Sequence, residues 1–304
     1  MIPAVLITGA KGFLGSRLCE CLSGNNDFSV IGGARTAENG PSGFTLVEMD
    51  ITDRRAVNDV FSKHRPVAVV HAAAAIGSGT TAMDVRTMND NNVMGTANLL
   101  ASAMEHGCER FVFCSSESVY DGSTRLRGLL TEEAAPAPEN AYGWSKLAGE
   151  ELLRICSKSG GPAGVTLRLA GIHGPGRPAG VVYHYLRAAL EGSRLKVNEP
   201  ETRMRPLFID DALQAVELAL SADLPASYNC YNTASEDAFS LRRLAETVIE
   251  ETGSVSGMDA ADGTGRQKDM EIDKIRHELG YVPGPLRRHL DRYITYLKQQ
   301  GRAQ

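Results

Sequence analysis

The chain has 304 residues, of which 42% are hydrophobic and 23% charged, values ordinary for a soluble globular protein with a large core. Its net charge of −5 provides no basic field for nucleic acid or an anionic membrane surface. The six cysteines form no Cys-x-x-Cys pair and no Cys/His cluster with zinc spacing, so we expect reduced thiols, no metal site and a cytoplasmic protein. The N-terminal apolar run is too short to span a bilayer.

The first fifteen residues predict a strand that runs directly into a glycine-rich turn and a helix. Gly9, Gly12 and Gly15 follow the apolar residues 4–8 with the spacing Gly-x-x-Gly-x-x-Gly. The bare N–H groups of such a turn, with the positive end of the next helix, hold a phosphate or pyrophosphate. We expect Gly9 to allow the tight turn, Gly12 the approach of a cofactor, and Gly15 the packing of helix on strand. The alternative is a glycine-rich loop that binds no ligand. The position of the glycines at a strand–helix junction disfavours this alternative.

Strand and helix signals then alternate, which indicates a parallel sheet with helices on both faces. The predicted strands are residues 4–8, 29–32, 45–49, 67–71, 110–114, 165–169 and 207–209. The predicted helices are residues 13–22, 54–63, 83–106, 142–157, 181–190, 210–220, 240–251, 273–279 and 286–299. Residues 171–178 and 253–265 are predicted loops, because they are rich in glycine, proline or small polar residues.

This alternation predicts an α/β fold, a Rossmann-type doubly wound parallel sheet with a smaller C-terminal lobe. Residues 1–170 are expected to form a dinucleotide-binding domain that also receives residues 205–233. Residues 171–304 are then expected to form mainly a substrate-binding lobe. Ligands of open α/β sheets bind beyond the carboxyl ends of the strands, so we expect a cleft between the lobes.

Tyr142 and Lys146 are four residues apart and therefore share one face of a predicted helix. A buried ammonium beside a phenol stabilises the phenolate, which makes the tyrosine a usable acid/base near neutral pH. By itself such a pair is also common as a surface contact. Ser116 lies in a serine-rich segment after a buried strand, where its hydroxyl could hydrogen-bond a substrate oxygen. A simple strand-end turn is the alternative for that segment.

Together and in this order, these motifs resemble those of the extended short-chain dehydrogenase/reductase family, in its epimerase/dehydratase branch. The resemblance covers nearly the whole chain and rests on residues 8–15, 50–51, 71–74, 92–96, 115–120, 142–146, 167–168, 174–175, 208–211 and 279–283. It implies that Tyr142 is the catalytic acid/base, that Lys146 holds the nicotinamide ribose, and that Ser116 is the active-site hydroxyl. The implied chemistry is hydride transfer at a secondary alcohol or ketone carbon.

The same resemblance implies a nicotinamide dinucleotide as cofactor, either NADP or NAD. Besides Tyr142 and Lys146, the residues expected to hold it are Gly9, Gly12, Phe13, Leu14, Gly15, Arg35, Asp50, Ile51, Ala72, Ala73 and Ala74. Members that prefer NAD usually end the second strand with an acid that binds the ribose 2′-hydroxyl. Here Ala34 takes that position and Arg35 follows it, which favours a 2′-phosphate and hence NADP. The alternative is that Arg35 only stacks on adenine or faces solvent and that the cofactor is NAD.

The residues that would contact the substrate depart from the pattern of the family. Nucleotide-sugar enzymes commonly carry an Asn where this chain has Gly171, and a Tyr where it has His173. Arg205 is a candidate for anion binding, with surface charge as the alternative. Glu117 matches one dehydratase acid, but Ser118 replaces the second, and a solvated loop carboxylate is the alternative for Glu117. We expect a small-molecule substrate, most simply a nucleotide sugar, contacted by Glu117, His173 and Arg205.

Three functions are consistent with these motifs. The first is a sugar epimerase, most simply a nucleotide-sugar 4-epimerase that transfers hydride transiently and keeps its cofactor. The second is an NADP-dependent ketoreductase or dehydrogenase of a sugar-like or other small carbonyl substrate. The third is a non-catalytic dinucleotide-sensing protein, which the intact Ser, Tyr and Lys disfavour. The resemblance also implies a homodimer, formed through the helices near residues 83–106 and 142–157 as a four-helix bundle.

Overall fold

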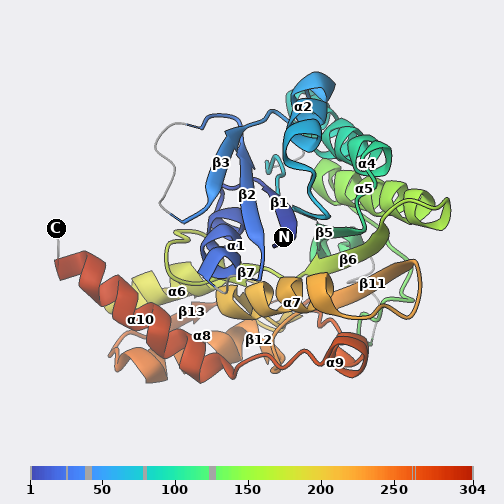
Figure 1. Ribbon diagram of the computed structural model, residues 1–304. Helices are drawn as coiled ribbons and strands as arrows, with labels where there is room; N and C mark the ends of the chain where they lie inside the picture. The colour runs from blue at the N-terminus through green and yellow to red at the C-terminus, as the bar shows by residue number, and fades with distance from the viewer. Residues whose placement is uncertain are drawn as a thin grey trace. The chain divides into compact units, whose positions relative to one another are not determined.

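The computed structural model of the chain describes residues 2–24, 27–37, 43–77, 81–122, 128–261, 263 and 265–302, which fall into two compact units (Figure 1). Unit 1 comprises Met1–Asp121, Pro136–Arg168 and Leu213–Tyr231. Unit 2 comprises Gly122–Ala135, Leu169–Ala212 and Asn232–Gln304. Among the described residues, no helix is both long and apolar enough to cross a membrane.

Unit 1 is built around a seven-stranded sheet with the strand order β11-β6-β5-β4-β1-β2-β3. Its strands are β1 (Ala4–Thr8), β2 (Ser29–Ala34), β3 (Thr45–Glu48), β4 (Ala68–His71), β5 (Arg110–Ser116), β6 (Ala163–Leu169) and β11 (Tyr228–Thr233). β1 pairs in parallel with both β2 and β4, β2 with β3, and β4 with β5. The strand order reverses between β1 and β4, which is the switch point of a doubly wound sheet. The predicted Rossmann-type α/β fold is confirmed.

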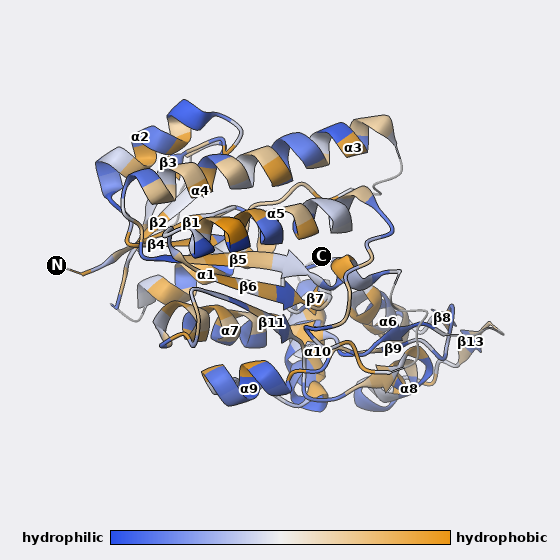
Figure 2. Cartoon of the chain, turned by 90° about the vertical axis from the view of Figure 1, so that its right-hand side faces the viewer, coloured by the Kyte–Doolittle hydropathy of each residue, from blue (hydrophilic) through white to orange (hydrophobic). Residues whose placement is uncertain are grey.

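Helices cover both faces of this sheet. They are α1 (Phe13–Gly24), α2 (Arg54–His64), α3 (Ala82–Met88), η1 (Asn89–Met94), α4 (Gly95–Glu105), η2 (Glu117–Tyr120), α5 (Ala141–Lys158) and α7 (Ile209–Ser221). Figures 1 and 2 show α1 and α7 on one face of the strands and α2, α4 and α5 on the other. The strands read as continuous apolar runs because both of their faces are buried, with Leu6, Val69 and Phe111 fully inaccessible.

Unit 2 has its own core, formed by the apolar faces of three helices, α6 (Val181–Leu190), α8 (Leu241–Thr252) and α10 (Leu286–Arg302). Ser240 caps α8 by accepting a hydrogen bond from the N–H of Arg243 at 3.1 Å. The other elements are β7 (Ile172–His173), β8 (Leu195–Val197), β9 (Arg203–Met204), β10 (Leu207–Phe208), β12 (Phe239–Ser240), β13 (Met258–Ala260), β14 (Gln267–Lys268) and α9 (Asp273–Leu279).

The structure differs from the sequence prediction in several elements. β11 was not predicted, because polar residues interrupt its apolar pattern. The N–H of Gly164 donates to the oxygen of Ser227 at 2.8 Å and that of Ala170 to Thr233 at 2.9 Å, so β11 extends the sheet beside β6 in the same direction. The helix predicted over residues 83–106 contains the π turn η1 between α3 and α4. The strand predicted to end at residue 114 continues to Ser116. The predicted loops 171–178 and 253–265 contain the short strands β7 and β13.

Candidate active site

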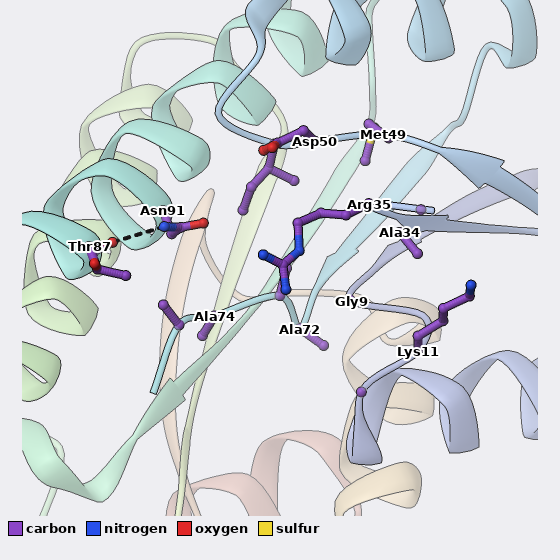
Figure 3. A pocket seen from close by; sticks show the side chains of 15 residues that line it. Gly9, Lys11, Ala34, Arg35, Met49, Asp50, Ala72, Ala74, Thr87 and Asn91 are labelled. Carbon is purple, nitrogen blue, oxygen red and sulfur yellow. Dashed lines mark hydrogen bonds between the residues drawn. The ribbon is translucent and has the colours of Figure 1, made fainter. Parts of the chain in front are cut away.

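A cavity of about 400 Å³ lies in unit 1, where β1, β2 and β4 end (Figure 3). Eight residues of the predicted cofactor set line it, namely Gly9, Gly12, Arg35, Asp50, Ile51, Ala72, Ala73 and Ala74. Three further members, Phe13, Leu14 and Gly15, belong to the first turn of α1 and are not part of the lining. The small side chains along the ends of β1 and β4 leave a slot that a flat ligand can enter.

The glycine turn has the backbone geometry that its spacing predicts. Gly9 has a φ of +73°, which favours glycine, and a Cβ there would lie 2.9 Å from the Cα of Ala73. A Cβ on Gly15 would lie 2.1 Å from the carbonyl oxygen of Gly9, so only glycine lets α1 pack this closely on the turn. The N–H of Gly12 donates to the same oxygen at 2.8 Å and closes the turn.

Arg35 reaches into the cavity from the end of β2, with its guanidinium between Asp50 and Ala72 (Figure 3). Within the described part of the chain, its guanidinium makes no hydrogen bond and no ion pair. Lys11, which was not predicted, also lines the cavity, and its Nζ donates to Oγ1 of Thr36 at 2.9 Å. Two cationic side chains therefore line the cavity beside Ala34, where NAD-preferring relatives carry an acid.

Tyr142 and Lys146 share one face of α5, close to its N-terminus. Asn140 caps this helix by accepting a hydrogen bond from the N–H of Gly143 at 2.9 Å. Nζ of Lys146 is 5.9 Å from the centre of the Tyr142 ring and 4.9 Å from that of Phe113. Burial lowers the pKa of Lys146 to about 8, although the charge of Glu150 acts in the opposite direction. The predicted pair thus comes together as a half-buried phenol beside a buried ammonium.

Ser116 is the last residue of β5, and its Oγ accepts a hydrogen bond from the N–H of Ser118 at 3.2 Å. The short helix η2 that follows packs directly on α5. Gly143 makes this approach possible, because a Cβ there would lie 2.4 Å from the carbonyl oxygen of Ser118. Ser116 and Tyr142 therefore come from two elements in close contact. Glu117, the first residue of η2, is half-buried.

A buried asparagine that the sequence reasoning assigned no role links α5 to the cavity. The amide of Asn92, in the π turn, accepts from the N–H of Ala75 at 2.7 Å and donates to Oγ of Ser145 at 2.9 Å. Ser145 in turn donates to the carbonyl oxygen of Tyr142 at 2.8 Å. π turns are frequent at functional sites. The signal that could have identified this residue was its place in residues 92–96, one of the segments on which the family resemblance rests.

The two substrate residues predicted in unit 2 already have partners there. His173 is buried against the rings of Phe208 and Tyr293, and burial followed by the neighbouring His289 lowers its pKa to about 3. Nε of Arg205 lies 2.5 Å from Oδ1 of Asp269, within an ion pair. The ion pair therefore occupies Arg205, whereas both ring nitrogens of His173 are buried and meet no hydrogen-bond partner among the described residues. Across the described residues, no group of three or more His, Cys, Asp or Glu could hold a metal ion.

Comparisons with known proteins agree with this fold. UDP-glucose 4-epimerase of Rhizobium meliloti (strain 1021) is 32% identical over 213 residues, which are 69% of this chain and 60% of that protein. The match thus spans less than two thirds of that relative's length.

Two solved structures share the fold. UDP-glucose 4-epimerase of Thermotoga maritima, solved with UDP-glucose, has a TM-score of 0.86 at 24% identity, covering 98% of this chain and 99% of that one. UDP-glucuronic acid 4-epimerase of Bacillus cereus, solved with NAD, has a TM-score of 0.82 at 25% identity, covering 97% and 99%. The model of the NAD dependent epimerase/dehydratase family matches residues 5–232. This chain therefore belongs to the NAD dependent epimerase/dehydratase family, as its motifs predict.

Proposed function

We propose that this protein is a nucleotide-sugar 4-epimerase. The observation that carries the proposal is the pairing of Tyr142 with the buried Lys146 on α5, which Asn92 and Ser145 link to the wall of the cavity. Family membership supports it, and so does the 32% identical relative, which is a UDP-glucose 4-epimerase. A UDP-linked hexose is accordingly the substrate to test first.

The cavity fits a nicotinamide dinucleotide. A phosphate needs close approach to bare N–H groups at a helix N-terminus, and the turn of Gly9 and Gly12 offers them before α1. The alanines at 72–75 leave room for a flat ring system. When bound, the dinucleotide supplies a reversible acceptor for hydride. We assign dinucleotide binding to residues 1–170 together with residues 205–233, and substrate binding mainly to residues 171–304.

In this proposal Tyr142 is the acid/base of the reaction. Its phenolate would remove the proton of the sugar 4-hydroxyl when C4 is oxidised to the ketone, and would return that proton when C4 is reduced from the opposite face, the bound dinucleotide taking up and giving back the hydride. The ammonium of Lys146 stabilises the phenolate and holds the nicotinamide ribose. The hydroxyl of Ser116 hydrogen-bonds the reacting oxygen. Glu117, next to Ser116, is the candidate for an additional substrate contact.

The proposed substrate contacts in unit 2 require rearrangement. Arg205 binds an anionic diphosphate only if the substrate replaces Asp269 as its partner. Arg203 is half exposed and shares Asp269 at 3.6 Å, so it is the more available of the two cations. His173 would have to leave its packing against Phe208 to reach a ligand.

We further propose that NADP binds more tightly than NAD. Ala34 provides no carboxylate to repel a 2′-phosphate, and Arg35 and Lys11 are two cations that could pair with one. The Bacillus cereus structure contains NAD, so the two dinucleotides need to be compared directly in this protein. The same observation favours a second candidate function, an NADP-dependent ketoreductase, because a reductase exchanges its cofactor in every cycle.

One experiment separates these functions. The purified protein is denatured and any released dinucleotide is identified, and the intact protein is then incubated with UDP-glucose and followed by proton NMR. Retained dinucleotide and conversion to the 4-epimer without net redox change support the epimerase. An empty protein that consumes NADPH with a keto substrate supports the reductase. Absence of both activities, with dinucleotide bound, overturns both and favours a sensor.

We also propose a homodimer. Exposed apolar side chains gather on α3, η1, α4 and α5, which lie side by side (Figure 2); they are Met83, Val85, Met94, Met104, Trp144 and Ile155. A second copy could cover them by packing the same helices as a four-helix bundle. Sedimentation velocity tests this: Met104→Glu with Ile155→Glu should yield monomers, whereas Val282→Glu, at an exposed site in unit 2, should not. A wild-type monomer would contradict the proposal.

A further inference from the structure

A buried ion pair joins α5 to β6 in unit 1, close to the proposed acid/base residues. Nη2 of Arg168 is 2.7 Å from Oε2 of Glu150, and Nε of Arg168 is 3.1 Å from Oε1. The side chains are 7% and 2% exposed. The hydroxyl of Ser115 donates to the same carboxylate, and Arg168 also donates to the hydroxyl of Tyr120. The forked contact and the added hydrogen bonds hold the Glu150 carboxylate in one place.

Glu150 lies one helical turn after Lys146 on α5. Burial by itself disfavours the charged form of a lysine. Cys114 and Glu150 act against burial and raise the pKa of Lys146. Burial raises the pKa of the Cys114 thiol to about 12, so this thiol is neutral where Lys146 titrates. Glu150 is therefore the group that supplies negative charge to Lys146.

Among the residues that the structure describes, Glu150 is the only carboxylate that acts on the pKa of Lys146. His71 on β4 is buried, and burial together with Lys146 lowers its pKa to about 3, so its ring is neutral. Phe113 and Cys114 on β5 contribute a ring face and a carbonyl oxygen. On α5 itself Lys146 faces Tyr142, and β6 contributes Arg168, which pairs with Glu150 and is not among the groups that act on the pKa of Lys146.

We propose that Glu150 is a positioning residue that acts through Lys146. Clamped by Arg168 and Ser115, its carboxylate keeps a fixed negative charge one turn from the ammonium and keeps that ammonium ionised inside the protein. The forked contact with Arg168 occupies the carboxylate, so Glu150 does not pair directly with Lys146, whose Nζ donates to the carbonyl oxygen of Cys114. This inference rests on the role proposed above for Lys146.

The test measures the ionisation of Lys146 directly. The full chain is labelled with [ε-¹³C]lysine and titrated by NMR, and the Lys146 signal is assigned by its loss in Lys146→Met. The combined variant Glu150→Gln, Arg168→Met removes both buried charges at once, a replacement that folded proteins often tolerate. Its Lys146 midpoint should be lower than in the wild type by about one pH unit. Glu151→Gln, which changes the exposed neighbouring glutamate, should leave the midpoint where it is.

A purely structural role of the ion pair would change stability but not this midpoint, so an unchanged midpoint in the folded double variant overturns the inference. If the double variant does not fold, Arg168→Met alone decides, because Lys146 is then the remaining cation beside Glu150. Its midpoint should rise, and an unchanged or lower value overturns the inference. The titration needs no substrate, so a failed epimerase assay would count against the proposed function and not against this result.

Discussion

The ammonium of Lys146 donates a hydrogen bond to the carbonyl oxygen of Cys114, with 2.8 Å between Nζ and O. This bond ties α5 to β5, the strand whose last residue is Ser116. It also fixes the direction of a long, otherwise flexible side chain, so that Nζ stays beside the ring of Tyr142. A charge that is positioned before the substrate arrives needs no reorganisation during the reaction.

Replacing Tyr142 by Phe should remove the proposed acid/base and leave the dinucleotide cavity intact. The phenyl ring fills the same space, but it cannot exchange a proton. We expect epimerisation of UDP-glucose, followed by proton NMR, to slow by about 10²- to 10⁴-fold. Dinucleotide affinity, measured by quenching of the Trp144 fluorescence, should change little.

Tyr296→Phe is the matched control, because this half-buried tyrosine belongs to α10 of unit 2. It should leave turnover at the wild-type level. If Tyr142→Phe retains wild-type turnover, Tyr142 is not the acid/base, and the proposed mechanism is wrong.

Arg35→Ala should reduce the proposed preference for NADP. The guanidinium has no other partner among the described residues, so its removal costs only the contact with the 2′-phosphate. A charge-assisted contact of this kind contributes about 1.5–3 kcal/mol, which corresponds to a roughly 10- to 100-fold loss of NADP affinity. NAD affinity should stay within a few-fold, as should both affinities in the control Arg54→Ala. A wild type that prefers NAD, with the same ratio in Arg35→Ala, would refute the assignment.

Local sequence patterns were sufficient to predict the parts of the site that lie within a single turn or a single helix. The glycine spacing at 9, 12 and 15 and the Tyr142–Lys146 interval are short-range patterns, and their backbone geometry follows from sterics. Alternating strands and helices likewise determined the fold class, since the central strands of the sheet are buried on both faces and read as apolar runs.

Long-range partners could not be predicted in this way. Arg205 was expected to be available for an anion, but Asp269, 64 residues later, pairs with it. No sequence pattern close to either residue indicates that contact. The strand β11 was missed because its sequence, Tyr-Asn-Cys-Tyr-Asn-Thr, is neither a continuous apolar run nor an apolar–polar alternation. The π turn in residues 89–94 was also missed, since it changes the helix by a single residue.

Gly15→Ala should destabilise the fold and thereby test the packing of α1 on the turn. The new methyl group would lie 2.1 Å from the Gly9 oxygen, which belongs to the backbone and cannot turn away. We expect the free energy of unfolding to fall by about 3 kcal/mol in urea titrations. Gly24→Ala is the control within the same helix. Nothing lies within 4 Å of its Cβ, so a gain of about 0.5 kcal/mol is expected. Equal effects of the two substitutions would contradict the close packing.

His173→Leu should make unit 2 more resistant to acid. Burial and His289 lower the pKa of His173 from 6.5 to about 3. Between these values the unfolded chain binds a proton that the folded chain does not, so stability is lost as the pH falls from about 6.5 towards 3. The loss approaches about 1.4 kcal/mol for each pH unit in that window. Leucine does not titrate. As the pH falls through this window, the free energy of unfolding of the variant should therefore rise relative to that of the wild type by the same amount for each pH unit.

Asp211 contributes with the opposite sign, because burial and the neighbouring Asp210 raise its pKa to about 6. Its contribution is present in both proteins and cancels in their difference to first order. Urea titrations of wild type and His173→Leu at pH 8, 6 and 5 measure that difference. A difference independent of pH would mean that His173 is not held neutral by burial. A raised KM for UDP-glucose in the same variant would instead support the predicted contact of His173 with the substrate, because loss of ring packing alone should leave KM unchanged.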